Sequence, residues 1–170
     1  MTLISLPYRV GLYVSFADTT GGFAAQEAEM QSLSGILREF AEDYCKSEFS
    51  QKVLMESLRA RDVWPSWSQG IERVPDEARH IFTLLEPQFD SRALRAFKEV
   101  LVEIALSVAM AFREGNEDTQ RGGGLSSIGE WFSRMLGGGK SSSSMGHSNI
   151  SKSERVALAR LCKAMNYQMG

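Results

Sequence analysis

The sequence predicts an all-α fold built as one domain. Apolar residues recur three and four positions apart along most of the chain, which is the spacing of one helix face. No segment shows the sustained alternation of apolar and polar residues, rich in β-branched types, that marks a strand. The 170 residues, of which 43% are hydrophobic, suffice for one core and are cramped for two. We therefore expect a single domain over residues 1–170, with two repeated helix pairs around a buried central helix.

The first two predicted helices lie in the N-terminal third of the chain. Pro7 suits the first turn of a helix that runs to about Ala17. The Thr-Thr-Gly-Gly stretch at 19–22 interrupts the pattern, because its glycines accept backbone angles that end a helix. A second helical pattern follows over about residues 24–58 and is bent around residues 46–47. This part of the chain therefore predicts two helices joined by a Gly-rich loop.

The segment 64–67, with the sequence Trp-Pro-Ser-Trp, ends the second helical pattern. Pro65 disfavours helical backbone angles at Trp64. We expect the two indole rings to fill one end of the core, and an exposed binding patch is the alternative interpretation. A short helix should follow Pro75 and stop before Pro87.

The remaining two helices are predicted from their caps and their apolar content. Asp90 or Ser91 should cap a helix over about residues 92–112. It is apolar on most faces, so we expect it to be the central buried helix. Its predicted core positions are Val102, Ala105, Leu106 and Ala109. A final helix begins at a capping box, in which Ser151 and Glu154 satisfy each other's backbone N–H groups.

Residues 114–149 differ from the rest in composition. They contain two runs of three glycines and a run of four serines, which is typical of a flexible linker. Between the glycine runs, residues 125–136 place their apolar side chains on one side of a predicted amphipathic helix. The candidate partner-binding residues on that side are Leu125, Ile128, Trp131, Phe132, Met135 and Leu136. This helix has three possible docking surfaces: its own domain, a groove on a protein partner, or a membrane interface.

The two halves of the chain show a similar pattern. An apolar helix over 10–18 precedes a Gly break and a second helix that carries Glu27 near its start. An apolar helix over 102–110 precedes a longer Gly-rich break and a second helix that carries Glu154 near its start. A repeated helix pair cannot bury its apolar face alone, so we expect the two halves to pack on each other.

At these residues the sequence resembles the TerB-like family, named for a tellurite-resistance protein. The family hallmark is an apolar helix ending Ala-x-Ala-Asp-Gly, followed by Ser or a similar residue and then by x-x-Glu, which opens the next helix. In the first half of this chain Thr19 and Thr20 are inserted before the glycine. The matching residues are Ala17, Asp18, Gly21 and Glu27 in the first half, and Ala109, Ser151 and Glu154 in the second. Met110 stands where the second half of the family has its aspartate.

The resemblance covers about residues 1–112 and 150–166 and implies an all-α fold with pseudo-twofold helix pairs. TerB-like proteins are associated with tellurite and general stress resistance, and often with membrane-linked complexes. The resemblance also implies a divalent-metal site on acidic loop residues, with Ca²⁺ or Mg²⁺ as the cation. The candidate ligands are Asp18, Glu27, Glu154 and Glu114. Helix capping is the alternative explanation for Glu27 and Glu154, because a negative charge complements the dipole of a helix N-terminus.

Composition excludes several functional classes. A net charge of −2 leaves no excess of positive charge for binding nucleic acid. We find neither a basic leader nor an apolar run of membrane length, and Cys45 and Cys162 lack CxxC spacing. We therefore expect a cytoplasmic protein with buried or half-buried thiols. We expect a non-enzymatic, TerB-like stress-response protein that acts through protein contacts. The alternatives are a metal-dependent enzyme using the acidic loops and a structural subunit of a larger, membrane-associated assembly. The sequence does not indicate an oligomeric state.

Overall fold

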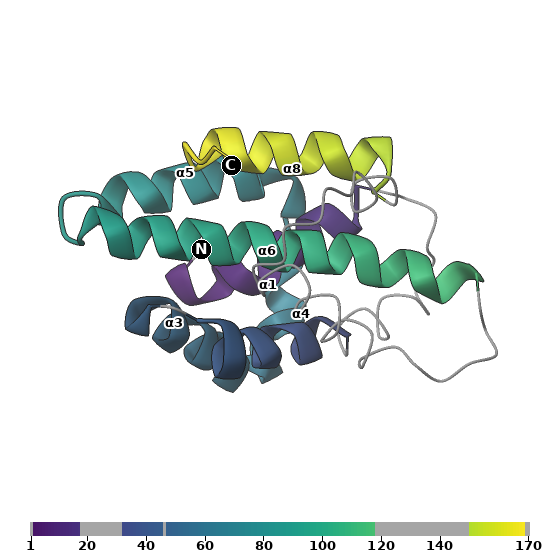
Figure 1. Ribbon diagram of the computed structural model, residues 1–170, viewed down its shortest axis with the longest axis horizontal. Coiled ribbons are helices and arrows are strands. Elements are labelled where there is room, and N and C mark those ends of the chain that lie inside the picture. The colour runs from purple at the N-terminus through teal and green to yellow at the C-terminus, as the bar shows by residue number, and fades with distance from the viewer. Residues whose placement is uncertain (1, 18–31, 46, 118–149, 169–170) are drawn as a thin grey trace, which may run out of the picture.

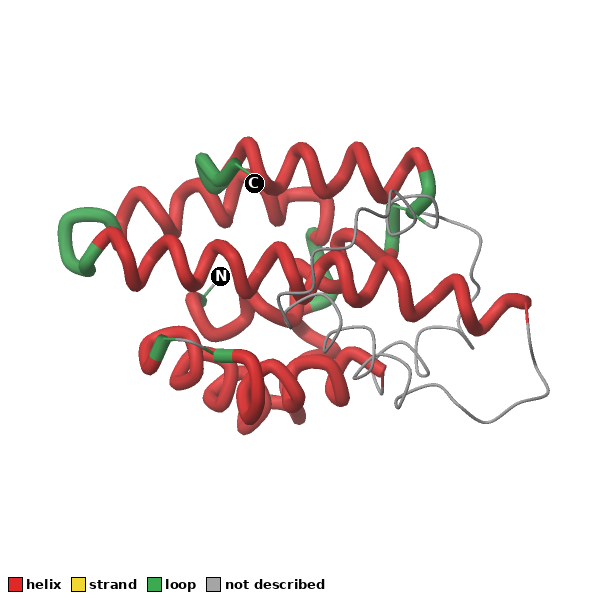
Figure 2. The backbone as a smooth tube through the Cα atoms, in the orientation of Figure 1, coloured by secondary structure: helices red, strands yellow, loops and turns green. Residues whose placement is uncertain are grey.

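The computed structural model describes residues 2–17, 32–45, 47–117 and 150–168, with side chains described up to residue 110 in the third range. Helices joined by short turns account for almost all of these residues, and no strand occurs among them (Figures 1 and 2). The predicted all-α fold is confirmed. The pseudo-repeat stays a prediction, because the first of its two loops, residues 18–31, lies outside the described residues.

The elements follow one another along the chain with few extended residues between them. Their bounds are η1 Leu3–Ser5, α1 Leu6–Ser15, a helical segment over 32–39, the π-helical turn η2 Phe40–Tyr44, α3 Glu48–Arg59, η3 Arg61–Val63, α4 Trp64–Trp67, η4 Ile71–Arg73, α5 Val74–Leu85, α6 Ser91–Glu117 and α8 Lys152–Ala164.

The helices form three layers, with α1 and α6 in the middle (Figure 1). On one side lie α5 and α8, and on the other lie α3, α4 and the segment 32–44. A first core cluster fills the space between the middle pair and α5 with α8, and includes Val10, Phe82, Leu101 and Leu161. A second core cluster fills the space on the opposite side and includes Leu12, which lies on α1. Both clusters therefore depend on the same two central helices.

The two central helices approach each other closely at Gly11. A Cβ atom added at this position would lie 2.6 Å from Cδ1 of Leu33 and 3.2 Å from Cγ2 of Val108. Both distances are shorter than ordinary van der Waals contact, so only glycine fits here without displacing its neighbours. Because Gly11 has no side chain, α1 can lie this close to α6 and to the segment 32–39.

The predicted central helix is confirmed as the buried α6. Val102, Ala105 and Ala109 are buried, but Leu106 is only half-buried, contrary to expectation. Leu106 lies three residues after Glu103 and four before Met110, which are also half-buried, so this stripe of α6 faces the edge of the core. The helix also continues to Glu117 and overlaps the start of the expected linker.

The N-terminus of α6 is capped as its sequence predicts. The Asp90 carboxylate accepts hydrogen bonds from the backbone N–H groups of Arg92 at 3.0 Å and Ala93 at 3.2 Å. These bonds satisfy two donors that have no partner within the helix.

Where the helical pattern over 24–58 was expected to bend, around residues 46–47, the structure has a break between two helices. A π-helical turn ends at Tyr44, Cys45 has extended backbone angles (φ −70°, ψ 109°), and a new helix begins at Glu48 with Ser47 as its N-cap. The Gln51 side chain donates to the Ala41 carbonyl at 3.0 Å and so replaces a hydrogen bond that a continuous helix would make. The chain is broken here rather than bent, which lets α3 return along the preceding segment.

The expected non-helical conformation of Trp64 is wrong. Trp64 opens α4 with helical angles (φ −54°, ψ −38°), and Pro65 occupies the first turn, where its missing N–H costs nothing. The indole ring is buried, its Nε1 donates to the Ser57 carbonyl at 2.9 Å, and Tyr8 stacks on it with ring centroids 4.4 Å apart. Trp64 is therefore a core residue, as the preferred interpretation of this segment requires.

Candidate functional site

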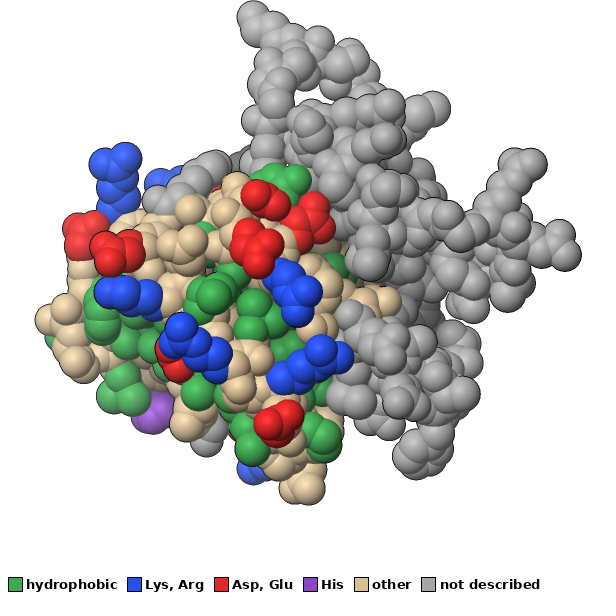
Figure 3. Space-filling model, turned by 90° about the horizontal axis from the view of Figure 1, so that it is seen from below, with side chains coloured by type: hydrophobic (Ala, Val, Ile, Leu, Met, Phe, Trp, Pro, Cys, Tyr) green, Lys and Arg blue, Asp and Glu red, His purple; other side chains and the backbone are tan. Residues whose placement is uncertain are grey.

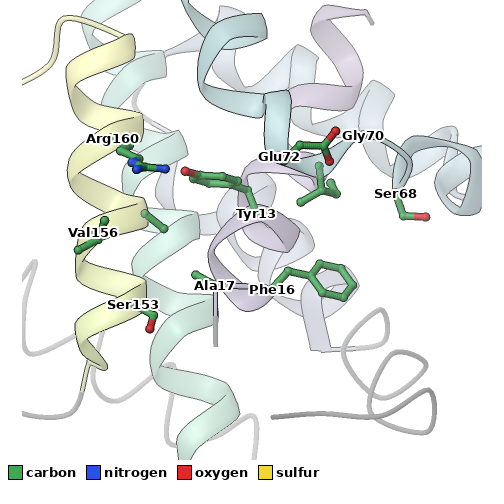
Figure 4. A pocket seen from close by; sticks show the side chains of 11 residues that line it. Tyr13, Phe16, Ala17, Ser68, Gly70, Glu72, Ser153, Val156 and Arg160 are labelled. Atoms are coloured by element: carbon green, nitrogen blue, oxygen red, sulfur yellow. The ribbon is translucent and has the colours of Figure 1, made fainter. Parts of the chain in front are cut away.

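An open pocket of about 540 Å³ lies where α1, η4 and α8 meet (Figure 4). This volume lies within the range of ligand-binding clefts in proteins. Three segments that are distant in sequence line it: Tyr13, Phe16 and Ala17 from the end of α1, Ser68, Gly70, Ile71 and Glu72 from the turn before and within η4, and Ser153, Val156, Ala157 and Arg160 from α8. We refer to it as the α1–α8 pocket.

The lining of the α1–α8 pocket is mainly apolar. Ala157 belongs to the first core cluster, and Tyr13 and Ile71 pack against that cluster from the pocket side. Phe16 and Val156 stay 40% and 54% exposed, although both are large apolar side chains. When another molecule covers such exposed apolar side chains, water is released from the edge of the pocket and from the apolar surface of that molecule, which favours binding.

Polar groups lie at the edge of the pocket. Tyr13 and Arg160 point toward one another, the phenol from α1 and the guanidinium from α8 (Figure 4). Arg160 is exposed, and no carboxylate in the described parts of the chain lies within ion-pair distance of it. Glu72 contributes a carboxylate from η4. The edge thus offers hydrogen-bond donors beside α8 and one negative charge beside η4.

A buried arginine fixes the turn that forms one wall of the pocket. Arg9, on α1, donates to the carbonyls of Trp67, Gln69 at 2.8 Å and Gly70 at 3.1 Å, and to the Glu77 carboxylate at 2.7 Å. The Arg9 side chain is only 6% exposed, so its charge depends on these partners in place of water. The guanidinium thereby ties residues 67–70 to α1 and to α5.

Gly70 lets this turn close. Its φ of +64° lies in the left-handed region, which side chains with a Cβ atom rarely adopt. The Arg73 guanidinium lies against the position that a Cβ atom would take, 2.6 Å from Nη2. The wall beside η4 therefore depends on a glycine at this position.

The opposite wall begins at the predicted capping box of α8, which is confirmed. The Ser151 backbone N–H donates to Glu154 Oε2 at 2.7 Å, and the Glu154 backbone N–H donates to the Ser151 hydroxyl oxygen at 3.1 Å. The Glu154 carboxylate is buried and occupied by this cap. Ile150, immediately before the cap, is buried in the first core cluster and anchors the start of α8.

Of the four predicted metal ligands, only Glu154 has a described side chain. Glu154 caps α8, and Glu114 lies in the last turns of α6, where side chains are not described. Asp18 and Glu27 lie outside the described residues. Within residues 2–17, 32–45, 47–110 and 150–168, whose side chains are described, no group of three or more His, Cys, Asp or Glu side chains is arranged to hold a metal ion.

The predicted partner-binding residues, Leu125, Ile128, Trp131, Phe132, Met135 and Leu136, all lie outside the described residues. Both cysteines are free, with Cys45 half-buried and Cys162 buried, which agrees with their expected environment. Burial and the nearby Glu103 carboxylate raise the pKa of Cys45 to about 11, and burial raises the pKa of Cys162. Neither thiol is therefore an activated nucleophile at neutral pH.

The contacts by which Arg9 holds the turn over 67–70 were not predicted, although the residues around Arg9 give an indication of them. We call these contacts the Arg9 anchor. Arg9 is the one charged residue in the otherwise apolar segment 6–17. A charged side chain surrounded by core positions on a buried helix must find buried partners. The partners themselves lie about sixty residues away, so helical periodicity could not identify them.

Comparison with protein-family models, with curated proteins and with solved structures finds no match to this chain. Among the helices described, none has both the length and the apolar content to cross a membrane.

Proposed function

We propose that this chain is a non-enzymatic stress-response protein of the TerB-like kind, and that it acts by binding a protein partner at the α1–α8 pocket. The observation that carries the proposal is the pocket itself, an apolar surface edged by Phe16 and Val156, both incompletely buried. Two sets of hydrogen bonds hold the walls of the pocket in place: those of the Arg9 anchor and those of the capping box of α8. A binding surface needs this kind of rigid support more than it needs reactive groups.

The finer parts of the proposal come from the sequence resemblance. They are a role in tellurite resistance and a Ca²⁺ or Mg²⁺ ion held by Asp18 and Glu27. We also propose a cytoplasmic location, which the two free thiols support. The metal part has a direct test: if the ion binds, adding it raises the melting temperature, and Asp18→Asn removes that rise. A melting curve that millimolar cation leaves unchanged would leave only the protein-binding part.

The protein-binding part is tested by a photo-crosslinking amino acid placed at Phe16. Phe89 is the matched control, because it is also a phenylalanine, is also 40% exposed, and does not line the pocket. Each benzoylphenylalanine variant of the full chain is expressed in its native cells and irradiated, and the products are identified by mass spectrometry.

We expect one defined protein adduct from position 16 and none from position 89. The adduct should disappear when Val156→Asp is added, because a charge at the pocket edge disfavours apolar contact. Equal labelling at both positions, no intermolecular product at position 16, or a product that survives Val156→Asp would each overturn the proposal.

A further inference from the structure

The exposed side of α8 next to the pocket is basic. Within α8, four residues are cationic and one, Glu154, is acidic, and the Glu154 carboxylate is consumed by the helix cap. Lys152, Arg160 and Lys163 lie with Val156 on a common stripe, because spacings of four, four and three residues keep them within about 80° around the helix. We call this set the α8 stripe.

None of the cations of α8 forms an ion pair with any residue that the structure describes. On the opposite face of the molecule, by contrast, acidic and basic side chains are interspersed (Figure 3). In α3, which lies in the layer opposite α8 (Figure 1), Arg59 pairs with Glu56, and Lys52 pairs with Glu48. The α8 stripe is therefore a local concentration of positive charge on a chain whose net charge is −2.

The position of Lys152 adds to this argument. It is the first residue of α8, where the helix dipole disfavours a positive charge. Lys163 lies in the last turn, where the dipole favours one. Helix stability therefore accounts for Lys163 and not for Lys152.

The length of the stripe selects the kind of ligand. Lys152 and Lys163 are eleven residues apart on α8, which corresponds to about 16 Å along a helix. One carboxylate can pair with Arg160 and the Tyr13 hydroxyl, but it cannot also reach both ends of the stripe. A ligand with several carboxylates in a row and an apolar side that enters the pocket satisfies all of these groups together.

We infer that the partner presents an acidic amphipathic helix, whose apolar side chains enter the α1–α8 pocket and whose carboxylates lie along the α8 stripe. Helices dock in apolar grooves in this way through residues spaced three and four apart. Complementary charge then selects the partner and speeds encounter. The inference rests on the proposed function, because it names the chemistry of the partner at the same pocket.

The test uses the purified full chain and two fluorescein-labelled peptides of about four helical turns. Both have the same leucine face, and their polar face carries glutamate in one and lysine in the other. Fluorescence anisotropy should show that the acidic peptide binds and the basic peptide does not, with binding that weakens as NaCl is raised. Arg160→Glu should weaken binding of the acidic peptide about tenfold or more.

Arg155→Glu is the matched control on the same helix. Arg155 is exposed and cationic, but it lies about 100° around α8 from the centre of the α8 stripe and about 150° from the centre of the pocket-facing side. Arg155→Glu should therefore change affinity much less than Arg160→Glu does, by about threefold or less. Both substituted positions are exposed, and the helical circular dichroism of each variant verifies the fold. Equal losses in the two variants would overturn the inference, because they would show an effect of net charge alone.

Two further outcomes separate this inference from the proposed function. If neither peptide binds while photo-crosslinking at Phe16 still yields one protein adduct, the acidic helix is wrong and the proposed function stands. If neither peptide binds while the chain sediments with phosphatidylglycerol vesicles and not with phosphatidylcholine vesicles, the stripe binds an anionic membrane and the inference is overturned.

Discussion

The Arg9 guanidinium contacts the Glu77 carboxylate, with Nη2 2.7 Å from Oε2, and this ion pair joins α1 to α5 beside the pocket. The same guanidinium also donates to three backbone carbonyls of the turn over 67–70. One side chain therefore joins α1, this turn and α5. Because the guanidinium is buried, losing any one of these acceptors would leave part of its charge without a partner.

Replacing Arg9 therefore has a large expected effect on stability. Arg9→Met keeps the apolar stem of the side chain but removes the guanidinium, which leaves a carboxylate and three carbonyls without their donor. We expect a loss of about 3–5 kcal/mol in the free energy of unfolding, measured by urea denaturation. Glu77→Gln should cost less, because the amide oxygen still accepts from the guanidinium. An Arg9→Met variant as stable as the original chain would show that the anchor does not fix the turn.

The close approach at Gly11 predicts a coupled pair of substitutions. Gly11→Val places new atoms where Cδ1 of Leu33 now lies, so we expect a loss of about 1–3 kcal/mol from overpacking. Leu33→Ala alone should cost about 2–5 kcal/mol, because it leaves a cavity in the second core cluster. The double variant should be more stable than the sum of the two losses predicts, because one change makes room for the other. Simple additivity in thermal unfolding would argue against this contact.

The capping box predicts different outcomes for two substitutions of Glu154. Glu154→Ala removes the acceptor for the Ser151 N–H, and the expected loss is about 0.5–2 kcal/mol. Glu154→Gln keeps an acceptor in the same place and should cost less, since glutamine also closes a capping box. Differential scanning calorimetry of the two variants, with Ser151→Ala as a third, measures this. Losses that are equal for Ala and Gln would mean that the charge of Glu154 matters more than its hydrogen bond.

The raised pKa of Cys45 predicts slow thiol chemistry. A shift from the ordinary value of 9.0 to about 11 leaves the thiol protonated at pH 8, and its reaction with Ellman's reagent should be about 100-fold slower than in the unfolded chain. The measurement uses a Cys162→Ala variant so that Cys45 alone reports. Between pH 9 and 11 the unfolded chain loses this proton and the folded chain keeps it, so this contribution to stability is lost as pH rises through that window. A native thiol that titrates near pH 9 would contradict the burial of Cys45.

Features that depend on neighbouring residues could be predicted from the sequence. Pro7 and Pro75 mark the first turns of α1 and α5, Asp90 caps α6, and Ser151 with Glu154 caps α8, as expected. In each case the determinant is one side chain acting within four residues. Local chemistry therefore predicts where most of these helices begin.

Features that depend on distant contacts were missed or mistaken. Pro65 disfavours helix at Trp64 locally, but the buried indole and its bond to Ser57 outweigh that preference. The bend expected around residues 46–47 is a break, because α3 returns along the preceding segment, and apolar spacing does not encode that return. The pocket could not be predicted, because its walls come from three segments that only the folded chain brings together.

Because α1 and α6 each contribute side chains to both core clusters, neither outer layer can detach without exposing apolar surface of the central pair. Local opening on one side therefore weakens the packing on the other, and the domain is built to unfold in a single cooperative transition. Amide hydrogens of α8 and of α3 should then share the same slowest exchange free energy, although the two helices lie in different layers. A partner that binds at α8 would slow exchange throughout α3 without touching it.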